Sequence, residues 1–241
     1  MRNGAVGLMV AVLMASAACG AGDGSPLTTE VEKISYAVGL NVGEMLVAQE
    51  TEIDFPALVE GVRDRMRNAK TRLTLAEAKT VIEKERQQYF RRQQQAALTN
   101  SIAGQKFLEE NKKRPGVQVT PSGLQFEVVK QGTGLRPACT DIVTFHCKSM
   151  FIDGRVFDDT TKRGEPTTFP LTNLIGGWRE GIQLMNRGTV ARLFVPPQLA
   201  YGRAGQPYVK IGPDMTLMFE VELLDFTNAP AATAAAGDTM K

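Results

Sequence analysis

One stretch of the chain, from Val143 to Phe226, decides the fold, and its centre runs Leu174-Ile175-Gly176-Gly177-Trp178-Arg179-Glu180-Gly181. This centre holds the only tryptophan of the protein, and the stretch around it sets aromatic and apolar residues between glycine and proline turns. Large apolar side chains enclosed by tight turns are typical of a buried pocket. The stretch therefore favours a binding pocket over a site for acid–base chemistry.

The composition argues against several other classes of function. With 241 residues, 43% of them hydrophobic, the chain suffices for one large or two modest globular domains. A net charge of +2 provides no field that would attract nucleic acid. A single histidine, His146, argues against a His-based triad, and the three cysteines lack the C-x-x-C spacing of zinc sites. We therefore expect no metal, no cofactor and no nucleic-acid partner.

The N-terminus has the pattern of an export signal, which we assign to residues 1–18. Arg2 provides a short positive region, and an apolar stretch over 5–15 is too short to span a bilayer. Small residues then precede Cys19, which resembles a bacterial lipobox in which the cysteine is lipidated, although Ser16 stands where a leucine is usual. Acyl chains on Cys19 would anchor the protein, and no other segment is expected to meet a membrane. We predict an exported, periplasmic or outer-membrane lipoprotein, with ordinary cleavage after Ala17 as the alternative.

Residues 19–27 form a flexible Gly/Ser/Pro tether, and a helical region is predicted over 28–115. Thr29 and Glu32 are spaced as a capping box, and Asp54 is a favourable N-cap for a second helix. A second capping box, Thr74 with Glu77, opens a helix of roughly 40 residues, about 60 Å long. Its apolar residues are too sparse for a coiled-coil seam, and Gly104 is expected to weaken it.

The first two helices are amphipathic and cannot bury their apolar faces against a mostly polar rod. A second copy of the chain can cover these faces, because identical apolar stripes are self-complementary about a two-fold axis. We therefore predict a homodimer through residues 28–75. A small monomeric three-helix domain is the alternative.

From residue 116 onward the sequence pattern changes to that of strands. Alternating or β-rich segments occur at 123–129, 142–152, 191–195 and 216–224, and a short helix is predicted over 178–185. On the second of these strands Val143, Phe145 and Cys147 share one face. The fold class is α+β, with an antiparallel sheet wrapped around one short helix over 116–228. The alanine-rich tail over 229–241 is predicted to be disordered.

Several motifs within this region occur in the order of a known family. They are Asp153-Gly154-Arg155-Val156-Phe157-Asp158, Gly177-Trp178-Arg179-Glu180-Gly181, Val195-Pro196-Pro197, Leu199-Ala200-Tyr201-Gly202 and Ile211-Gly212-Pro213. With them, the segment from about 116 to 226 resembles the FKBP-type peptidyl-prolyl cis-trans isomerases, or rotamases. The helical part and the join at Lys113-Arg114-Pro115-Gly116 resemble the macrophage infectivity potentiator and FkpA branch. Members of that branch are bacterial, exported and dimeric.

The resemblance implies an aromatic pocket, floored by Trp178, that holds the substrate proline. It makes Phe157, Asp158 and Tyr201 catalytic. It assigns substrate binding to Phe157, Asp158, Arg163, Phe169, Leu174, Ile175, Trp178, Tyr201, Ile211 and Phe219. Cys147 stands where the family has a tyrosine that braces the carboxylate matching Asp158. A thiol is smaller than a phenol, so the pocket is expected to be wider there.

The chemistry implied by the family needs no nucleophile. Rotation about an X–Pro bond is opposed by amide resonance, with a barrier of about 18–20 kcal/mol. A pocket that removes water from the amide carbonyl and grips the pyrrolidine ring favours the twisted amide. We expect proline-containing, partly folded polypeptides as partners and macrolides as inhibitors. A dimeric chaperone or surface-binding protein that recognises proline with little turnover is the alternative.

Each of these residues also has a purely structural interpretation. Trp178 could be ordinary core, and Asp158 could serve only to pair with Arg163. His146 alternates with Cys147 and is expected to face solvent. Cys139 and Cys147 would lie roughly 26 Å apart along one extended strand, so we predict no disulfide between them.

Overall fold

The computed structural model describes residues 25–48 and 52–227. The predicted signal over 1–18, the proposed lipidation site Cys19 and the predicted disordered tail over 229–241 lie outside this range. The chain divides after Met45 into two compact units. Within the described residues, no helix has the length and apolar character needed to span a membrane.

The predicted helix starts are confirmed. Helix α1 (Glu30–Ala48) begins after a reciprocal cap: Thr29 N donates to Glu32 Oε2 at 2.9 Å, and Glu32 N donates to Thr29 Oγ1 at 3.1 Å. Helix α2 (Phe55–Met66) begins after Asp54, whose carboxylate accepts from Ala57 N at 2.9 Å. These bonds satisfy backbone donors that a helix N-terminus leaves free.

Helix α3 (Leu75–Asn111) is the long predicted helix, and it has 37 residues. The predicted capping box of Thr74 and Glu77 is present at its start. At about 1.5 Å per residue, its length is roughly 55 Å.

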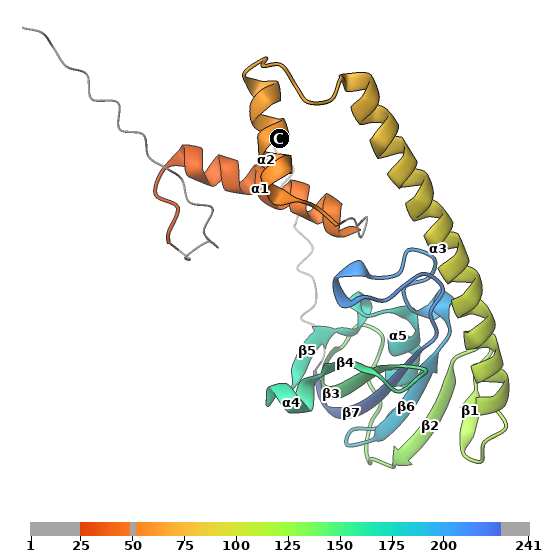
Figure 1. Ribbon diagram of the computed structural model, residues 1–241. Coiled ribbons are helices and arrows are strands. Elements are labelled where there is room, and N and C mark those ends of the chain that lie inside the picture. The colour runs from red at the N-terminus through yellow and green to blue at the C-terminus, as the bar shows by residue number, and fades with distance from the viewer. Residues whose placement is uncertain (1–24, 49–51, 228–241) are drawn as a thin grey trace, which may run out of the picture. The chain divides into compact units, whose positions relative to one another are not determined.

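Seven antiparallel strands form one sheet in the order β1-β2-β6-β7-β3-β4, with β5 paired to β3 (Figure 1). Short helices α4 and α5 and three 3-10 turns connect the strands. The bounds are β1 (Val117–Val119), β2 (Gln125–Lys130), β3 (Ile142–Phe151), β4 (Val156–Asp159), α4 (Thr160–Arg163), β5 (Thr167–Pro170), η1 (Leu171–Asn173), α5 (Gly176–Gln183), β6 (Val190–Val195), η2 (Pro197–Leu199), η3 (Pro207–Val209) and β7 (Leu217–Thr227).

The predicted α+β class is confirmed, because the sheet curves around α5 (Figure 1). Two glycines of the central motif explain how closely this helix approaches the sheet. A Cβ on Gly177 would lie 2.4 Å from Val195 Cγ1, and one on Gly181 would lie 2.7 Å from Leu193 Cδ2. Side chains at either position would push α5 away from β6. The glycines therefore let the helix seat Trp178 and Ile182 in the core, where both are buried.

The C-terminal end of α3 is fastened to the sheet. Asn111 Nδ2 donates to Gln125 Oε1 at 2.8 Å, and Gln125 Nε2 donates to the Leu108 carbonyl at 2.8 Å. Phe107 packs on Phe194 with ring centroids 5.9 Å apart. These contacts fix the C-terminal part of α3 against the sheet.

Gly104 has a role that the sequence pattern did not predict. It is buried in α3, and a Cβ there would lie 2.3 Å from Thr216 Oγ1. We expected this glycine only to weaken the helix. It also lies at a close approach between α3 and the loop that precedes β7.

Candidate active site

Five aromatic rings form a connected chain in the core beneath the sheet. Phe145 meets Trp178 with centroids 4.8 Å apart, and Trp178 meets Phe219 at 5.2 Å. Phe219 meets Phe157 at 6.4 Å, and Phe157 meets Phe151 at 4.9 Å. All four pairs are edge-on or tilted, which are favourable arrangements for aromatic rings. The predicted residues Phe157, Trp178 and Phe219 are thus brought together.

The register of β3 places the acidic residue of the site beside these rings. Ser149 on β3 lies opposite Asp158 of β4 on one side and opposite Phe219 of β7 on the other. Residues directly opposite each other in an antiparallel pair project from the same face of the sheet. Cys147, two residues before Ser149, projects from that face as well. Cys147 and Ser149 are both buried.

The carboxylate of Asp158 is held from two directions. Its Oδ1 forms a short ion pair with Arg163 Nη1, and its Oδ2 lies 3.8 Å from Cys147 Sγ. The Asp158 side chain is 33% exposed. The prediction that Cys147 faces Asp158 in place of a tyrosine is therefore consistent with the geometry. A distance of 3.8 Å describes a weak thiol bond, so the ion pair with Arg163 is the stronger restraint.

Two groups beside this carboxylate are kept protonated. Burial, followed by the charge of Asp158, raises the pKa of the Cys147 thiol to about 11. The same two causes, in the same order, raise the pKa of the Tyr201 phenol above its ordinary value. Both groups therefore remain hydrogen-bond donors at neutral pH. Neither is suited to act as a nucleophile or base.

The remaining predicted pocket residues surround the rings. Ile211 belongs to the buried core, and Leu174, Ile175 and Tyr201 are half-buried and pack against it. Phe169 on β5 differs, since it is 46% exposed and lies outside the core cluster. A solvent-exposed phenylalanine can meet a substrate but cannot help to enclose one.

Phe145 and Phe151 were missing from the predicted set although both belong to the aromatic chain. The alternation along β3 places both on the buried face with Cys147, which is the signal that could have identified them.

The prediction for His146 was wrong in part. It is half-buried rather than fully solvated, and its Nδ1 lies 3.0 Å from Thr160 Oγ1. Cys139 and Cys147 are both free thiols. Cys139 occupies a turn ahead of β3 and not the strand itself, so the extended-strand distance between them does not apply.

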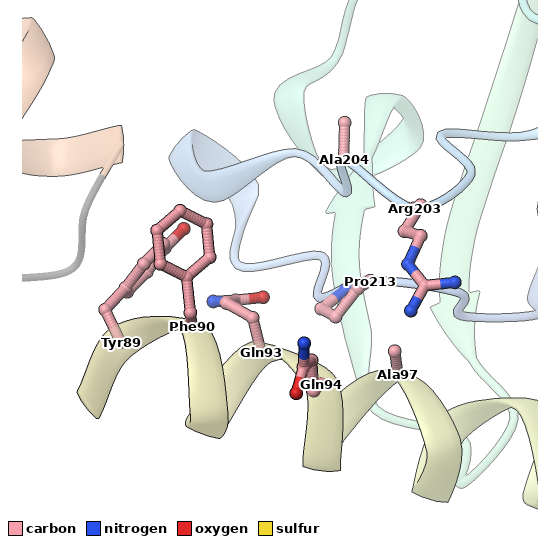
Figure 2. A pocket seen from close by; sticks show the side chains of 8 residues that line it. All are labelled: Tyr89, Phe90, Gln93, Gln94, Ala97, Arg203, Ala204 and Pro213. Atoms are coloured by element: carbon pink, nitrogen blue, oxygen red, sulfur yellow. The ribbon is translucent and has the colours of Figure 1, made fainter. Parts of the chain in front are cut away.

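A hollow of about 300 Å³ lies between α3 and the loop that follows Tyr201 (Figure 2). In Figure 2, Gln93 and the guanidinium of Arg203 lie on either side of Pro213. None of the aromatic-chain residues lines it, so it is separate from the site around Asp158. Among the described residues, no group of three metal-binding side chains occurs. The hollow is lined by Tyr89, Phe90, Gln93, Gln94, Ala97, Arg203, Ala204 and Pro213.

Two family models match consecutive parts of the chain. One describes the domain amino terminal to FKBP-type peptidyl-prolyl isomerase and matches residues 31–128. The other describes the FKBP-type peptidyl-prolyl cis-trans isomerase and matches residues 134–224. Together they span the helices, the sheet and every residue around Asp158.

Whole-chain comparisons agree with these matches. The chain is 38% identical to the outer membrane protein MIP of Legionella longbeachae, over 90% of this chain and 94% of that one. It is 42% identical to the FKBP-type 22 kDa peptidyl-prolyl cis-trans isomerase of Escherichia coli, over 79% and 93%. The crystal structure of FkpA from Escherichia coli is similar with a TM-score of 0.61 and 33% identity, over 85% of this chain and 100% of that one.

Proposed function

The chain belongs to the family of FKBP-type peptidyl-prolyl cis-trans isomerases, and from this premise we propose that it rotates X–Pro bonds of exported proteins and so assists their folding in the cell envelope. Uncatalysed rotation takes tens of seconds or more, which leaves partly folded chains exposed to aggregation. The observation that carries the proposal is the aromatic chain around Trp178 with the Asp158 carboxylate beside it.

We assign the catalytic step to desolvation and a few fixed dipoles. The rings of Phe157, Trp178 and Phe219 enclose the pyrrolidine, and the apolar surroundings remove water from the amide carbonyl. Loss of that water destabilises the planar, polar amide relative to the twisted one. The protonated hydroxyl of Tyr201 donates to the carbonyl, and Asp158 provides a negative group near the twisted amide.

The other substrate contacts are proposals of the same kind. Ile175 lies at the start of α5, where its backbone N–H is available to anchor the substrate main chain. Leu174 and Ile211 provide apolar wall, and the exposed Phe169 contacts residues beside the proline. Macrolides that fill such a pocket are expected to inhibit.

We place the protein in the cell envelope, exported by the signal over 1–18 and anchored through lipid on Cys19. Support comes from the pattern of small residues before Cys19 and from the relative named as an outer membrane protein. Mass spectrometry of the mature N-terminus tests this point. A diacylated Cys19 supports anchoring, and a free N-terminus at Ala18 contradicts it.

We propose a homodimer through residues 28–75. Apolar side chains on α1 and α2 stand in solvent in a single chain, for example Val31 at 74%, Phe55 at 66% and Met66 at 83%. Large apolar side chains left in solvent on a helix favour an association surface. Two isomerase sites in one dimer would also raise the apparent affinity for a long client that meets both.

A protease-coupled assay with a proline tetrapeptide tests the function. The wild type is expected to accelerate isomerisation, with inhibition by a macrolide. Asp158→Ala is expected to lower kcat/KM by roughly tenfold or more, since it removes a charge aimed at the twisted amide. Cys147→Tyr is expected to raise kcat/KM, because a phenol is a stronger donor to Asp158 than a thiol.

The alternative function is a dimeric proline-binding chaperone, which the weak 3.8 Å contact of Cys147 with Asp158 favours. It predicts undetectable turnover by the wild type and turnover restored by Cys147→Tyr. Suppression of client aggregation without turnover would then be the activity.

A further inference from the structure

Strand β3 has a break on the edge that faces β4 and β5. Its N-terminal part, Ile142 to Phe145, pairs with β5, and its C-terminal part, Lys148 to Met150, pairs with β4. Within the described residues, neither strand gives a register partner to His146 or Cys147 on this edge. An unpaired backbone N–H or C=O that is buried is costly, so the break needs another partner.

The side chain of Thr160 fills this break. Its Oγ1 accepts from Cys147 N at 2.9 Å and donates to the Cys147 carbonyl at 3.3 Å. The residue is fully buried, at 0% exposure, at the start of α4 (Figure 1). The Thr160 hydroxyl therefore provides both hydrogen bonds that a neighbouring strand would otherwise make with the N–H and C=O groups of Cys147.

The two groups that hold the Asp158 carboxylate, on Cys147 and Arg163, both depend on the hydrogen bonds between Thr160 and the Cys147 backbone. Cys147, whose backbone Thr160 binds, presents its thiol to Oδ2. Arg163 presents its guanidinium to Oδ1 from the single helical turn that Thr160 begins. Between them, Asp159 caps that turn by accepting from the backbone of Thr161 and Lys162. A shift of Thr160 moves both restraints at once.

We propose that Thr160 is a positioning residue of the isomerase site, whose hydroxyl ties α4 to β3 so that Cys147 and Arg163 meet Asp158 together. This inference rests on the proposed function. Thr160 does not touch the substrate and acts only through Asp158. The Thr160 Oγ1 also lies 3.0 Å from His146 Nδ1, and the imidazole tautomer decides which of the two atoms donates.

The test is a double-mutant cycle in the tetrapeptide assay with the full chain. Thr160→Val keeps the side-chain shape and removes the hydroxyl, and it is expected to lower kcat/KM about five- to tenfold, mainly through kcat. Thr160→Ser keeps the hydroxyl and is expected to stay within about twofold of the wild type. In an Asp158→Asn background the valine substitution is expected to change kcat/KM by less than about twofold, because residues that act as a unit are not additive.

Thr161→Val is the matched control, since it makes the same chemical change one residue on, where the side chain is exposed. Equal losses from Thr160→Val in the wild-type and Asp158→Asn backgrounds would overturn the proposal. So would wild-type activity in folded Thr160→Val, or failure of both Thr160→Val and Thr160→Ala to fold. The last outcome would make the hydroxyl a requirement of the whole fold.

A readout without turnover separates this inference from the proposed function. Alkylation of Cys147 by iodoacetamide, counted by mass spectrometry against Cys139, reports whether the β3 break has opened. We expect faster labelling of Cys147 in Thr160→Val, with unchanged labelling in Thr160→Ser and Thr161→Val. A wild type without turnover would refute the proposed function, whereas unchanged labelling of Cys147 in Thr160→Val would refute the positioning role of Thr160.

Discussion

Asp158 is the residue on which the account of catalysis depends, and its orientation comes from unequal partners. Arg163 forms a direct ion pair with one oxygen, whereas the Cys147 thiol approaches the other only to 3.8 Å. The ion pair adds attraction between opposite charges to its hydrogen bond, whereas a thiol is a weak donor even to a carboxylate. Where the family resemblance implies a bracing tyrosine, this chain relies mainly on its arginine.

Removing that arginine should therefore be costly for activity. Arg163→Ala is expected to lower kcat/KM about tenfold in the tetrapeptide assay, because the carboxylate loses its strong restraint. Arg92→Ala is the control, since Arg92 pairs with Glu85 on the exposed surface of α3. A loss of the same size in both variants would contradict the role given to Arg163.

The Cys147 thiol should resist alkylation at ordinary pH. Its pKa of about 11 lies above that of a free thiol, so the thiolate appears only at higher pH. At pH 8 about one thiol in a thousand is ionised, and labelling should accelerate about tenfold per pH unit up to pH 10. Mass spectrometry with iodoacetamide measures this, with the exposed Cys139 as internal reference. Labelling of both cysteines at the same rate at pH 8 would contradict the buried, protonated thiol.

The sequence predicted some of these residue-scale relations and missed others. The family resemblance placed Cys147 beside the carboxylate of Asp158 and assigned Phe157, Trp178 and Phe219 to the pocket. Thr160 could not be found this way, because its role comes from a gap between two strands that pair with β3. That gap depends on register, which a single sequence does not state.

Among the elements of the sheet, strand length separates the strands that the sequence predicts from the strands that it does not. The strands of six or more residues, β2, β3, β6 and β7, alternate clearly enough to be predicted. Strands β1, β4 and β5 have three or four residues, too few to display a period of two. They exist because their neighbours offer free backbone groups. Helix α5 was predicted over 178–185 and begins two residues earlier, at Gly176.

Gly104 provides a test of how α3 is joined to the sheet. In an open helix, alanine is favoured over glycine by about 1 kcal/mol. At this site the added Cβ would lie 2.3 Å from Thr216 Oγ1, so Gly104→Ala is expected to destabilise the full chain. The net loss should be about 1–2 kcal/mol, measured by chemical unfolding.

Gly61 in α2 is the matched control for this substitution. No atom lies within 4 Å of the position that its Cβ would take. Gly61→Ala should therefore leave stability unchanged or raise it by up to about 1 kcal/mol. Equal stabilisation by both substitutions would show that α3 does not pack at Gly104.

At the scale of the whole molecule, the exposed apolar residues of α1 and α2 predict assembly. Val62 on α2 is 52% exposed in the single chain. Val62→Glu should shift the protein from dimer toward monomer in analytical ultracentrifugation, because burying an unpaired charge opposes association. Tetrapeptide kcat/KM per site should stay unchanged. A wild type that is monomeric at micromolar concentration would contradict the proposed dimer.

We propose separable tasks for two parts of the molecule, catalysis near Asp158 and association through the N-terminal helices. For catalysis, we propose that a desolvating aromatic pocket rotates the X–Pro bond without covalent chemistry. Exchange NMR on a proline peptide, with the protein at substoichiometric concentration and no protease present, tests it most directly. The account predicts cis–trans exchange accelerated well above the uncatalysed rate, reduced in Asp158→Ala and abolished by a macrolide. Exchange at the uncatalysed rate with the folded wild type would contradict it.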